Sequence, residues 1–173
     1  MHIKLTPGQA VFLHGWLAAR QTLTWGDILN NPSLCFSVLL TANLPTTMLH
    51  QLQPDASSWI KNNKATIKDC AQMAQHWDVH PIRDFKADLA DIVSAKWPAH
   101  TMQQMNLTYP DLVQIGMTPV SMGLFTHVTL AGWAQLGFTK SHAADIHEVH
   151  LIRLFGIPKT DVMRSLSNEV LKK

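Results

Sequence analysis

The side chains best suited to chemistry are concentrated between residues 142 and 150. His142, Asp145, His147, Glu148 and His150 are of types that bind metal ions or transfer protons. His147 and His150 are three apart and could converge on one helix face, whereas His142 and His147 are five apart and diverge. The string HEVH also departs from HExxH, whose four-residue spacing places two histidines on one zinc ion. We therefore expect a polar helix face with one half-buried histidine, and a metal-dependent enzyme is only a third alternative.

Other potential catalytic groups lack the partners that their chemistry needs. They are His76 and His80, the carboxylates Asp84, Asp88 and Asp91, and the thiols Cys35 and Cys70. A proline follows His80 and disfavours helical geometry there. The carboxylates have the spacing of a solvated helix face, and the two cysteines, without CxxC spacing, are expected to be reduced and buried. No GxSxG, phosphate-binding loop or GxGxxG motif occurs. We therefore predict a non-enzyme with no catalytic residues, no bound metal and no cofactor.

The stretch LAGWAQLGFT, residues 130–139, raises the alternative of DNA binding. A helix over 129–136, a turn at Gly137 and a helix over 140–155 would form a helix-turn-helix. The residues placed to contact DNA would be Lys140, Ser141, His142 and Arg153. Against this, Trp133 would put a bulky ring at a tight helix crossing, and Asp145 and Glu148 would oppose phosphate. A DNA-binding regulator that uses 129–155 is therefore the alternative function.

The elements that position these groups are predicted to be short helices, because no long alternating run of apolar and polar residues indicates a strand. Threonine, a good N-cap, begins several segments. Gly116, Gly137 and Gly156 suit the left-handed residue that ends a helix, and the apolar residue after each should enter the core. The apolar spacing is most regular over 81–96 and 140–155. The predicted helices cover 8–20, 24–30, 33–42, 45–52, 55–62, 66–77, 81–96, 100–105, 109–115, 119–125, 129–136, 140–155 and 159–171.

Composition narrows the classes of function. The 173 residues are 46% hydrophobic, enough for a core, but only 15% are charged, and the net charge is +2. Such a balance argues against tight nonspecific DNA binding, which draws on several Lys or Arg contacts to phosphate. Residues 28–54 and 112–139 carry no Asp, Glu, Lys or Arg, yet their prolines, amides and glycines favour core segments over a membrane span. Without a recognisable signal peptide, we expect a location inside a cell or virus particle rather than secretion.

An internal duplication is predicted from four pairs of matching positions in the same order. The pairs are LTWGDIL at 23–29 with LTYPDLV at 107–113, LPTTML at 44–49 with MTPVSM at 117–122, Trp59 with Trp133, and TIKDCAQM at 66–73 with TKSHAADI at 139–146. Chance similarity among helix-start patterns is the alternative. We therefore predict an all-α fold of two related units of short packed helices, 1–98 and 99–173. Their boundary is expected near residues 97–100, and the units could pack as one domain.

The six tryptophans divide between core and surface roles. Trp59 and Trp133 are expected in the core, because the duplication places them at equivalent positions. Tryptophan is also enriched at interface hot spots. The candidate interface residues are Trp16, Trp25 and Trp97.

The strings LTYPDLVQIGMT and LAGWAQLGFT resemble short tandem helical segments found in some structural proteins of large DNA viruses. The resemblance covers about residues 106–146, with a fainter copy at 23–73, and it carries over no site residues. It implies a small, helical, capsid-associated protein that fills gaps between other subunits. Together with the low charge, it leads us to expect a structural or assembly protein that contacts other protein subunits, as a minor component of a virus particle. Nucleic acid is not the favoured partner.

Overall fold

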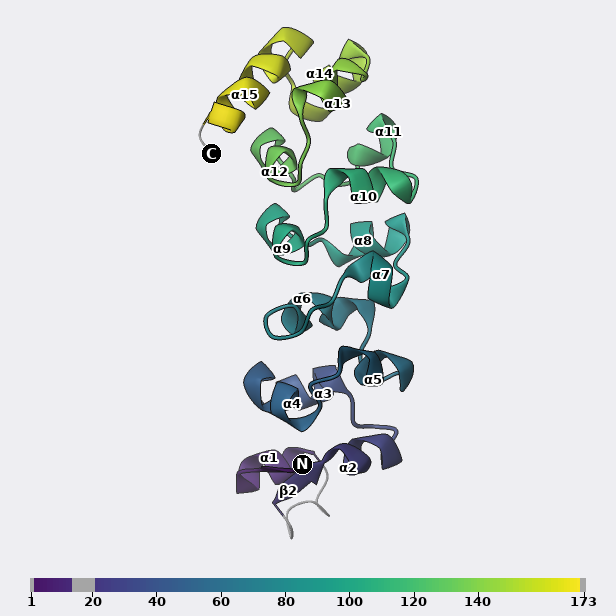
Figure 1. Ribbon diagram of the computed structural model, residues 1–173, viewed down its shortest axis with the longest axis vertical. Helices are drawn as coiled ribbons and strands as arrows, with labels where there is room; N and C mark the ends of the chain where they lie inside the picture. The colour runs from purple at the N-terminus through teal and green to yellow at the C-terminus, as the bar shows by residue number, and fades with distance from the viewer. Residues whose placement is uncertain (1, 14–20, 172–173) are drawn as a thin grey trace. The chain divides into compact units, whose positions relative to one another are not determined.

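The structure, a computed structural model, consists almost entirely of short helices, which confirms the predicted all-α class (Figure 1). It describes residues 2–13 and 21–171, with side chains described as far as Ser167. The chain divides into two compact units, Met1–Lys86 and Ala87–Lys173. The boundary predicted from the sequence lies after Pro98. Trp97 already belongs to the second unit, where its carbonyl accepts a hydrogen bond from Nε2 of His127 at 2.7 Å.

Each unit is a succession of helices that rarely exceed two turns. The first contains β1 (His2–Lys4), α1 (Pro7–Phe12), β2 (Thr22–Thr24), α2 (Trp25–Asn30), α3 (Phe36–Thr41), α4 (Thr46–Leu52), α5 (Ala56–Lys61), η2 (Ile67–Asp69), α6 (Cys70–Met73) and α7 (Pro81–Phe85). The second contains α8 (Leu89–Ala95), α9 (Ala99–Gln104), α10 (Tyr109–Gln114), α11 (Pro119–Met122), α12 (Leu130–Gln135), α13 (Lys140–Ala144), α14 (Glu148–Phe155) and α15 (Lys159–Leu171). Among the described helices, none is long and apolar enough to cross a membrane.

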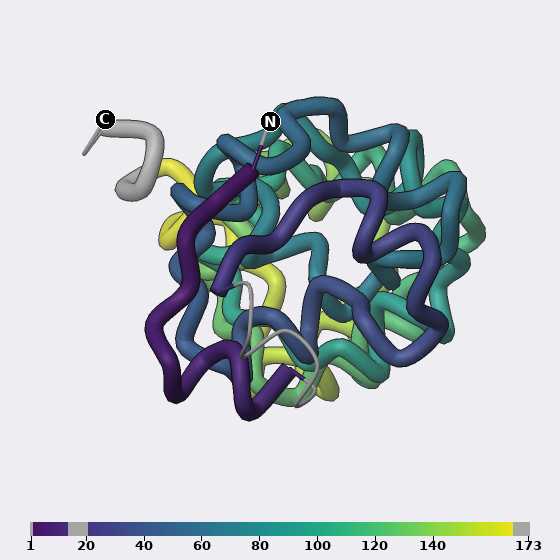
Figure 2. Tube along the Cα trace, turned by 90° about the horizontal axis from the view of Figure 1, so that it is seen from below, coloured from purple at the N-terminus to yellow at the C-terminus, as the bar shows by residue number. Residues whose placement is uncertain are grey.

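Two short strands in the first unit were not predicted. β1 and β2 pair antiparallel, with Ile3 opposite Leu23. Each strand has only three residues, and an alternating pattern becomes recognisable only over four or more. Ile3 and Leu23 are buried and β1 contacts α4, so this ribbon adds apolar side chains to a helical core. Figure 2 shows the purple N-terminal segment along one side of the unit. Of the helix expected over 8–20, residues 14–20 lie outside the described part.

The helices are connected by a recurring joint, which we define as a left-handed residue, an apolar residue one or two positions later and the N-cap of the next helix. The left-handed residues are Asn43, Asn63, Lys86, Lys96, Asn106, Gly116, Gly137 and Gly156. The three glycines confirm the sequence prediction, with φ of 106°, 93° and 71°. After the first two of these glycines, Met117 and Phe138 are buried as expected, and their N–H groups each donate to the carbonyl five residues back at 3.0 Å. The same expectation is wrong for Ile157, which follows Gly156 and is only half-buried. The other five joints were missed because asparagine and lysine are weaker signals than glycine.

Most joints end in a reciprocal capping box. At the start of α10, the Asp111 carboxylate accepts from the Thr108 N–H at 3.0 Å, and the Thr108 hydroxyl accepts from the Asp111 N–H at 3.3 Å. The same arrangement starts six other described helices, at Thr6, Thr24, Thr66, Asp88, Thr118 and Thr139. Each box satisfies two backbone donors that a short helix cannot pair internally.

The two helices with the most regular apolar spacing are each broken in two, contrary to the sequence prediction. The expected helix 81–96 ends at Phe85, because Lys86 is left-handed and Asp88 caps a new helix. The expected helix 140–155 ends at Ala144, and a second one begins after His147, whose Nδ1 accepts from the Val149 N–H at 3.1 Å. The apolar spacing of the sequence continues across each break, so periodicity alone does not show the interruption.

Two of the paired segments of the predicted duplication begin with the same kind of cap, whereas 44–49 and 117–122 differ, because Pro45 supplies no side-chain cap and Thr118 forms a capping box. Thr24 and Thr108 both start capping boxes, as do Thr66 and Thr139. The prediction that Trp59 and Trp133 are core residues is confirmed by their burial. Trp59 packs edge-on against Trp25 at 4.7 Å between ring centroids, and Trp133 against Tyr109 at 6.2 Å. Capping boxes recur throughout the chain, so a common origin of the two units stays a prediction.

The helices of the second unit form two rows. α12 packs against α9 and α15, while α11 packs against α14. Figure 1 shows α10, α11 and α14 along one side of this unit and α9, α12 and α15 along the other. α10, which belongs to the first of these rows, forms one wall of the site described below.

The lysines with a left-handed backbone conformation allow a test of whether backbone geometry sets the joints. Lys96 is exposed with φ of 53°, a conformation that costs a residue with a Cβ roughly 1 kcal/mol. We expect Lys96→Gly to raise the free energy of unfolding in urea by up to ~1 kcal/mol. The control Ala90→Gly, at an exposed position inside the same helix, should lower it by about 1 kcal/mol. A loss of stability in Lys96→Gly would contradict a joint set by backbone geometry.

The capping box of α10 gives a second prediction. Thr108→Ala removes the acceptor for the Asp111 N–H and should lower the free energy of unfolding by about 1 kcal/mol. Thr108→Ser keeps a hydroxyl and should retain most of the stability. Urea titration of both variants measures the difference, and equal stability of the two would show that the cap hydroxyl does not stabilise α10.

Candidate functional site

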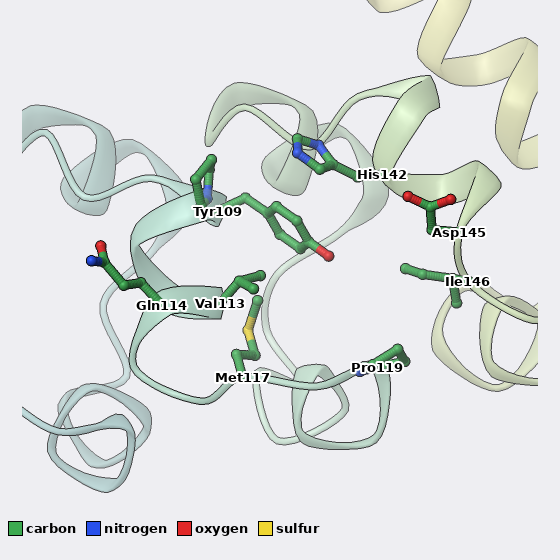
Figure 3. A pocket seen from close by; sticks show the side chains of 9 residues that line it. Tyr109, Val113, Gln114, Met117, Pro119, His142, Asp145 and Ile146 are labelled. Carbon is green, nitrogen blue, oxygen red and sulfur yellow. The ribbon is translucent and has the colours of Figure 1, made fainter.

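An open pocket of about 560 Å³ lies within the second unit, between α10 and α13 (Figure 3). Its volume falls within the range of small-molecule sites, roughly 300–1,000 Å³. We call it the Tyr109 pocket. Its lining residues are Tyr109, Pro110, Val113, Gln114, Met117, Pro119, His142, Asp145 and Ile146.

Three joints build this pocket. The capping box at Thr108 places Tyr109 as the first residue of α10, and the Tyr109 N–H donates to the Leu136 carbonyl at 2.7 Å. The joint at Gly116 then turns Met117 inward. On the opposite wall, the capping box between Thr139 and His142 starts α13, which leads to Asp145. The walls are therefore held by local backbone bonds and not by side-chain packing alone.

Two polar groups face the pocket from opposite walls. The Tyr109 hydroxyl points into it, and the Asp145 carboxylate lies on the far side (Figure 3). The pKa of Tyr109 is raised above its ordinary value by burial and, to a lesser degree, by the negative charge of Asp145. Among the described residues, no side chain or backbone group forms a hydrogen bond with the Tyr109 hydroxyl, and no cation pairs with Asp145. Both groups are thus open to a ligand.

His142 forms part of the same wall but has a structural role. Its Nδ1 accepts from the Thr139 N–H at 3.0 Å, and its ring lies 4.6 Å from that of Tyr109 between centroids. This backbone bond uses the lone pair that a general base would need. His142 is therefore not placed to act as a general base, and burial raises the pKa of Tyr109, which favours the protonated phenol.

The remaining candidate catalytic groups are mostly helix caps. His80 Nδ1 accepts from the Ile82 N–H at 3.1 Å, and Asp88 and Asp91 form the capping box of α8. Asp84 accepts from the His80 N–H at 2.7 Å and pairs with Arg83 at 2.9 Å. Burial raises the pKa of Asp84, but the hydrogen bonds from Arg83 and the His80 N–H outweigh it and lower the pKa overall.

The histidines of the 142–150 segment do not converge. His142 lines the pocket, His147 caps α14, and Nδ1 of His150 is buried without a hydrogen-bond partner. Within residues 2–13 and 21–171, no group of three His, Cys, Asp or Glu side chains is placed to hold a metal ion. The break between α13 and α14 separates these residues, which the sequence analysis expected on one helix.

The same break bears on the DNA-binding interpretation. Lys140 and Ser141 are exposed on α13, which has only five residues, and Arg153 is exposed on the separate helix α14. A recognition helix presents its contacts along one continuous helix in the major groove. The structure does not contain the helix over 140–155 that this interpretation requires.

The candidate interface tryptophans differ in their placement. Trp16 lies outside the described residues. Trp25 is half-buried against Trp59, and Trp97 is buried, with 8% of its surface exposed. The indole of Trp97 therefore belongs to the core of the second unit.

Five exposed aliphatic residues of the second unit were not singled out from the sequence, and the first of them also lines the pocket. They are Val113, Val120, Leu124, Val149 and Ile152. The first three fall within the charge-free stretch 112–139, which was a usable signal. We expected that whole stretch to lie in the core. Which of its aliphatic side chains face outward depends on where the helices end, and the apolar pattern does not show those ends.

The two cysteines are free, but they differ in burial. Cys70 is fully buried, and burial together with the charge of Asp84 raises the pKa of its thiol to about 12. Cys35 is only half-buried, and its Sγ lies 3.3 Å from the Ser37 hydroxyl. The prediction that both thiols are buried is therefore confirmed for Cys70 alone.

This difference predicts stepwise thiol labelling. Because the thiolate is the reactive form, Cys70 should react with iodoacetamide at pH 8 only after unfolding, whereas Cys35 should react in the folded protein. Peptide mass spectrometry after a timed pulse measures both sites. Native labelling of Cys70 as fast as that of Cys35 would show that the first unit opens around α6.

Comparison with known proteins assigns no family to this geometry. No family model matches the chain, and neither a curated protein nor a solved structure matches it. What can be said of its function rests on the pocket and the exposed side chains around it.

Proposed function

We propose that this protein is a non-enzymatic assembly protein that binds other protein subunits through one surface of its second unit. The observation that carries the proposal is the exposure of five large aliphatic side chains on α10, on α11 with its following turn, and on α14. Their exposed fractions are 44% for Val113, 61% for Val120, 58% for Leu124, 54% for Val149 and 48% for Ile152. We call this set the aliphatic surface.

Helix spacing and packing support a single continuous surface. Val149 and Ile152 are three residues apart within α14 and so lie on one side of that helix, while Val120 on α11 and Leu124 in the turn after it are both exposed. α11 packs against α14, which brings the two pairs to neighbouring elements. Val113 joins them through the Tyr109 pocket, whose wall also includes Pro119 and Ile146.

The charge distribution favours protein as the partner. Residues 112–139 contain no Asp, Glu, Lys or Arg, so most of this surface can be covered without stripping water from charged groups. Depletion of charge at the centre is typical of protein interfaces, whereas nucleic-acid surfaces are rich in Lys and Arg. Contiguous exposed apolar patches also mark interaction sites in general.

The setting follows from the same proposal. We place the protein in a larger assembly, inside a cell or as a minor capsid-associated component of a virus particle, and not among secreted proteins. The resemblance of its tandem segments to those of viral structural proteins supports this setting, as do its two free thiols.

Site-specific photocrosslinking in cells that produce the protein tests the proposal. With a benzophenone amino acid at Val120, we expect a discrete protein adduct. The same group at Gln104, exposed on α9 in the other row of helices, should give none. Leu124→Asp should reduce the Val120 adduct about ten-fold or more, as for an interface hot spot, without lowering stability. Equal adducts from Val120 and Gln104, or no adduct from a folded protein, would refute the proposal.

A further inference from the structure

We infer that the Tyr109 pocket receives the side chain of an arginine from the partner protein, with the guanidinium group at Asp145 and its alkyl stem between the apolar walls. This inference rests on the proposed function, because it specifies one contact of the partner that covers the aliphatic surface. Binding of a ligand in the Tyr109 pocket can be tested separately from binding of a partner to the aliphatic surface.

The charge of the pocket selects a cation. Asp145 is the only Asp, Glu, Lys or Arg that lines it. Lys159, the cation that contacts the same segment, is committed to backbone, since its Nζ donates to the Ala144 carbonyl at 2.8 Å and the Ile146 carbonyl at 3.0 Å. No ion pair in the described residues neutralises Asp145. A cation entering the pocket therefore meets an unpaired carboxylate.

The hydrogen-bonding groups select a ligand that donates. The Asp145 carboxylate only accepts, whereas the Tyr109 hydroxyl can accept as well as donate, and the two groups face the pocket from opposite walls (Figure 3). A guanidinium group carries five N–H donors and no acceptor, and its planar geometry matches a carboxylate in a two-bond pair. An ammonium group also carries three donors, but it presents them from one nitrogen and lacks the planar two-bond match to a carboxylate. The geometry of the pair at Asp145 thus favours arginine over lysine.

The apolar walls match the rest of the side chain. Val113 and Met117 stand on the α10 side and Ile146 on the α13 side (Figure 3). Arginine buries its three methylene groups along such walls while its charged head remains near water. Val113 belongs to both the pocket and the aliphatic surface, so a residue docked on that surface can extend its side chain into the cavity.

The first experiment uses n-butylguanidinium as a probe of the full-length protein. Methyl NMR should show saturable shifts of the Met117 and Ile146 resonances at millimolar probe, the range expected for so small a ligand. Pentanoate, with a similar stem and the opposite charge, should produce none. Equal shifts with pentanoate or with neutral butanol would overturn the inference, because they would show filling of an apolar cavity without charge selection.

Variants of pocket residues, each compared with a control, show which side chains bind the cation. Asp145→Asn should reduce affinity for n-butylguanidinium at least five-fold, while Glu148→Gln, which neutralises a nearby exposed carboxylate outside the pocket, should leave it unchanged. Tyr109→Phe keeps the ring contacts with Trp133 and Phe138 but removes the hydroxyl, so it should weaken binding several-fold. Unchanged affinity in Asp145→Asn, with the fold confirmed by urea unfolding, would overturn the inference.

The crosslinking assay then separates this inference from the proposed function. Asp145→Asn should reduce the Val120 adduct, and Glu148→Gln should not. If the adduct forms and is insensitive to Asp145→Asn, the pocket does not hold a partner's arginine, although the aliphatic surface still binds protein. If the parent protein forms no adduct while n-butylguanidinium binds, the proposed function fails, and with it the assignment of the arginine to a partner.

Discussion

The fold depends on one constraint, which is that a helix of one or two turns cannot satisfy its own backbone. The first four N–H groups and the last four carbonyls of any helix lack internal partners. In α10, which has six residues, this includes more than half of the polar backbone groups. The joints supply the missing bonds, through the capping box at Thr108 and the Met117 N–H bond to the Leu112 carbonyl. Because such short helices are unstable alone, joints and core packing have to form together.

This constraint also explains why the chain is rich in reactive residue types and yet holds no converging catalytic set in its described part. His80, His142 and His147 each accept a backbone N–H through Nδ1, and Asp88 and Asp111 complete capping boxes. A histidine in this role is held in one tautomer at the surface of a helix end. In a fold with long helices, His and Asp side chains at these positions would indicate catalysis. In this chain they supply hydrogen-bond acceptors to the ends of short helices.

The binding properties that we propose arise from the same architecture. Short helices leave few positions for burial, so α11 directs Met122 into the core while Val120 remains exposed. Tyr109 combines both roles, since its ring packs edge-on against Trp133 and Phe138 and its hydroxyl reaches the pocket. A rigid core residue thus presents a polar group to a ligand, which limits the conformational entropy lost on binding.

Local interactions were predictable from the amino-acid sequence. The all-α class, the glycine joints and the Thr caps depend on residues within about five positions of one another, and Trp59 and Trp133 are large enough to require a core. The breaks at Lys86 and at 145–147 were not predictable, because the apolar pattern continues through them.

Only the tertiary structure decided the pairing of Ile3 with Leu23, the burial of Trp97, the exposure of Val120 and the meeting of Tyr109 with Asp145. These features depend on which distant segment covers a side chain. A capping box is encoded by neighbours in the chain, whereas a pocket exists only where separate helices pack side by side.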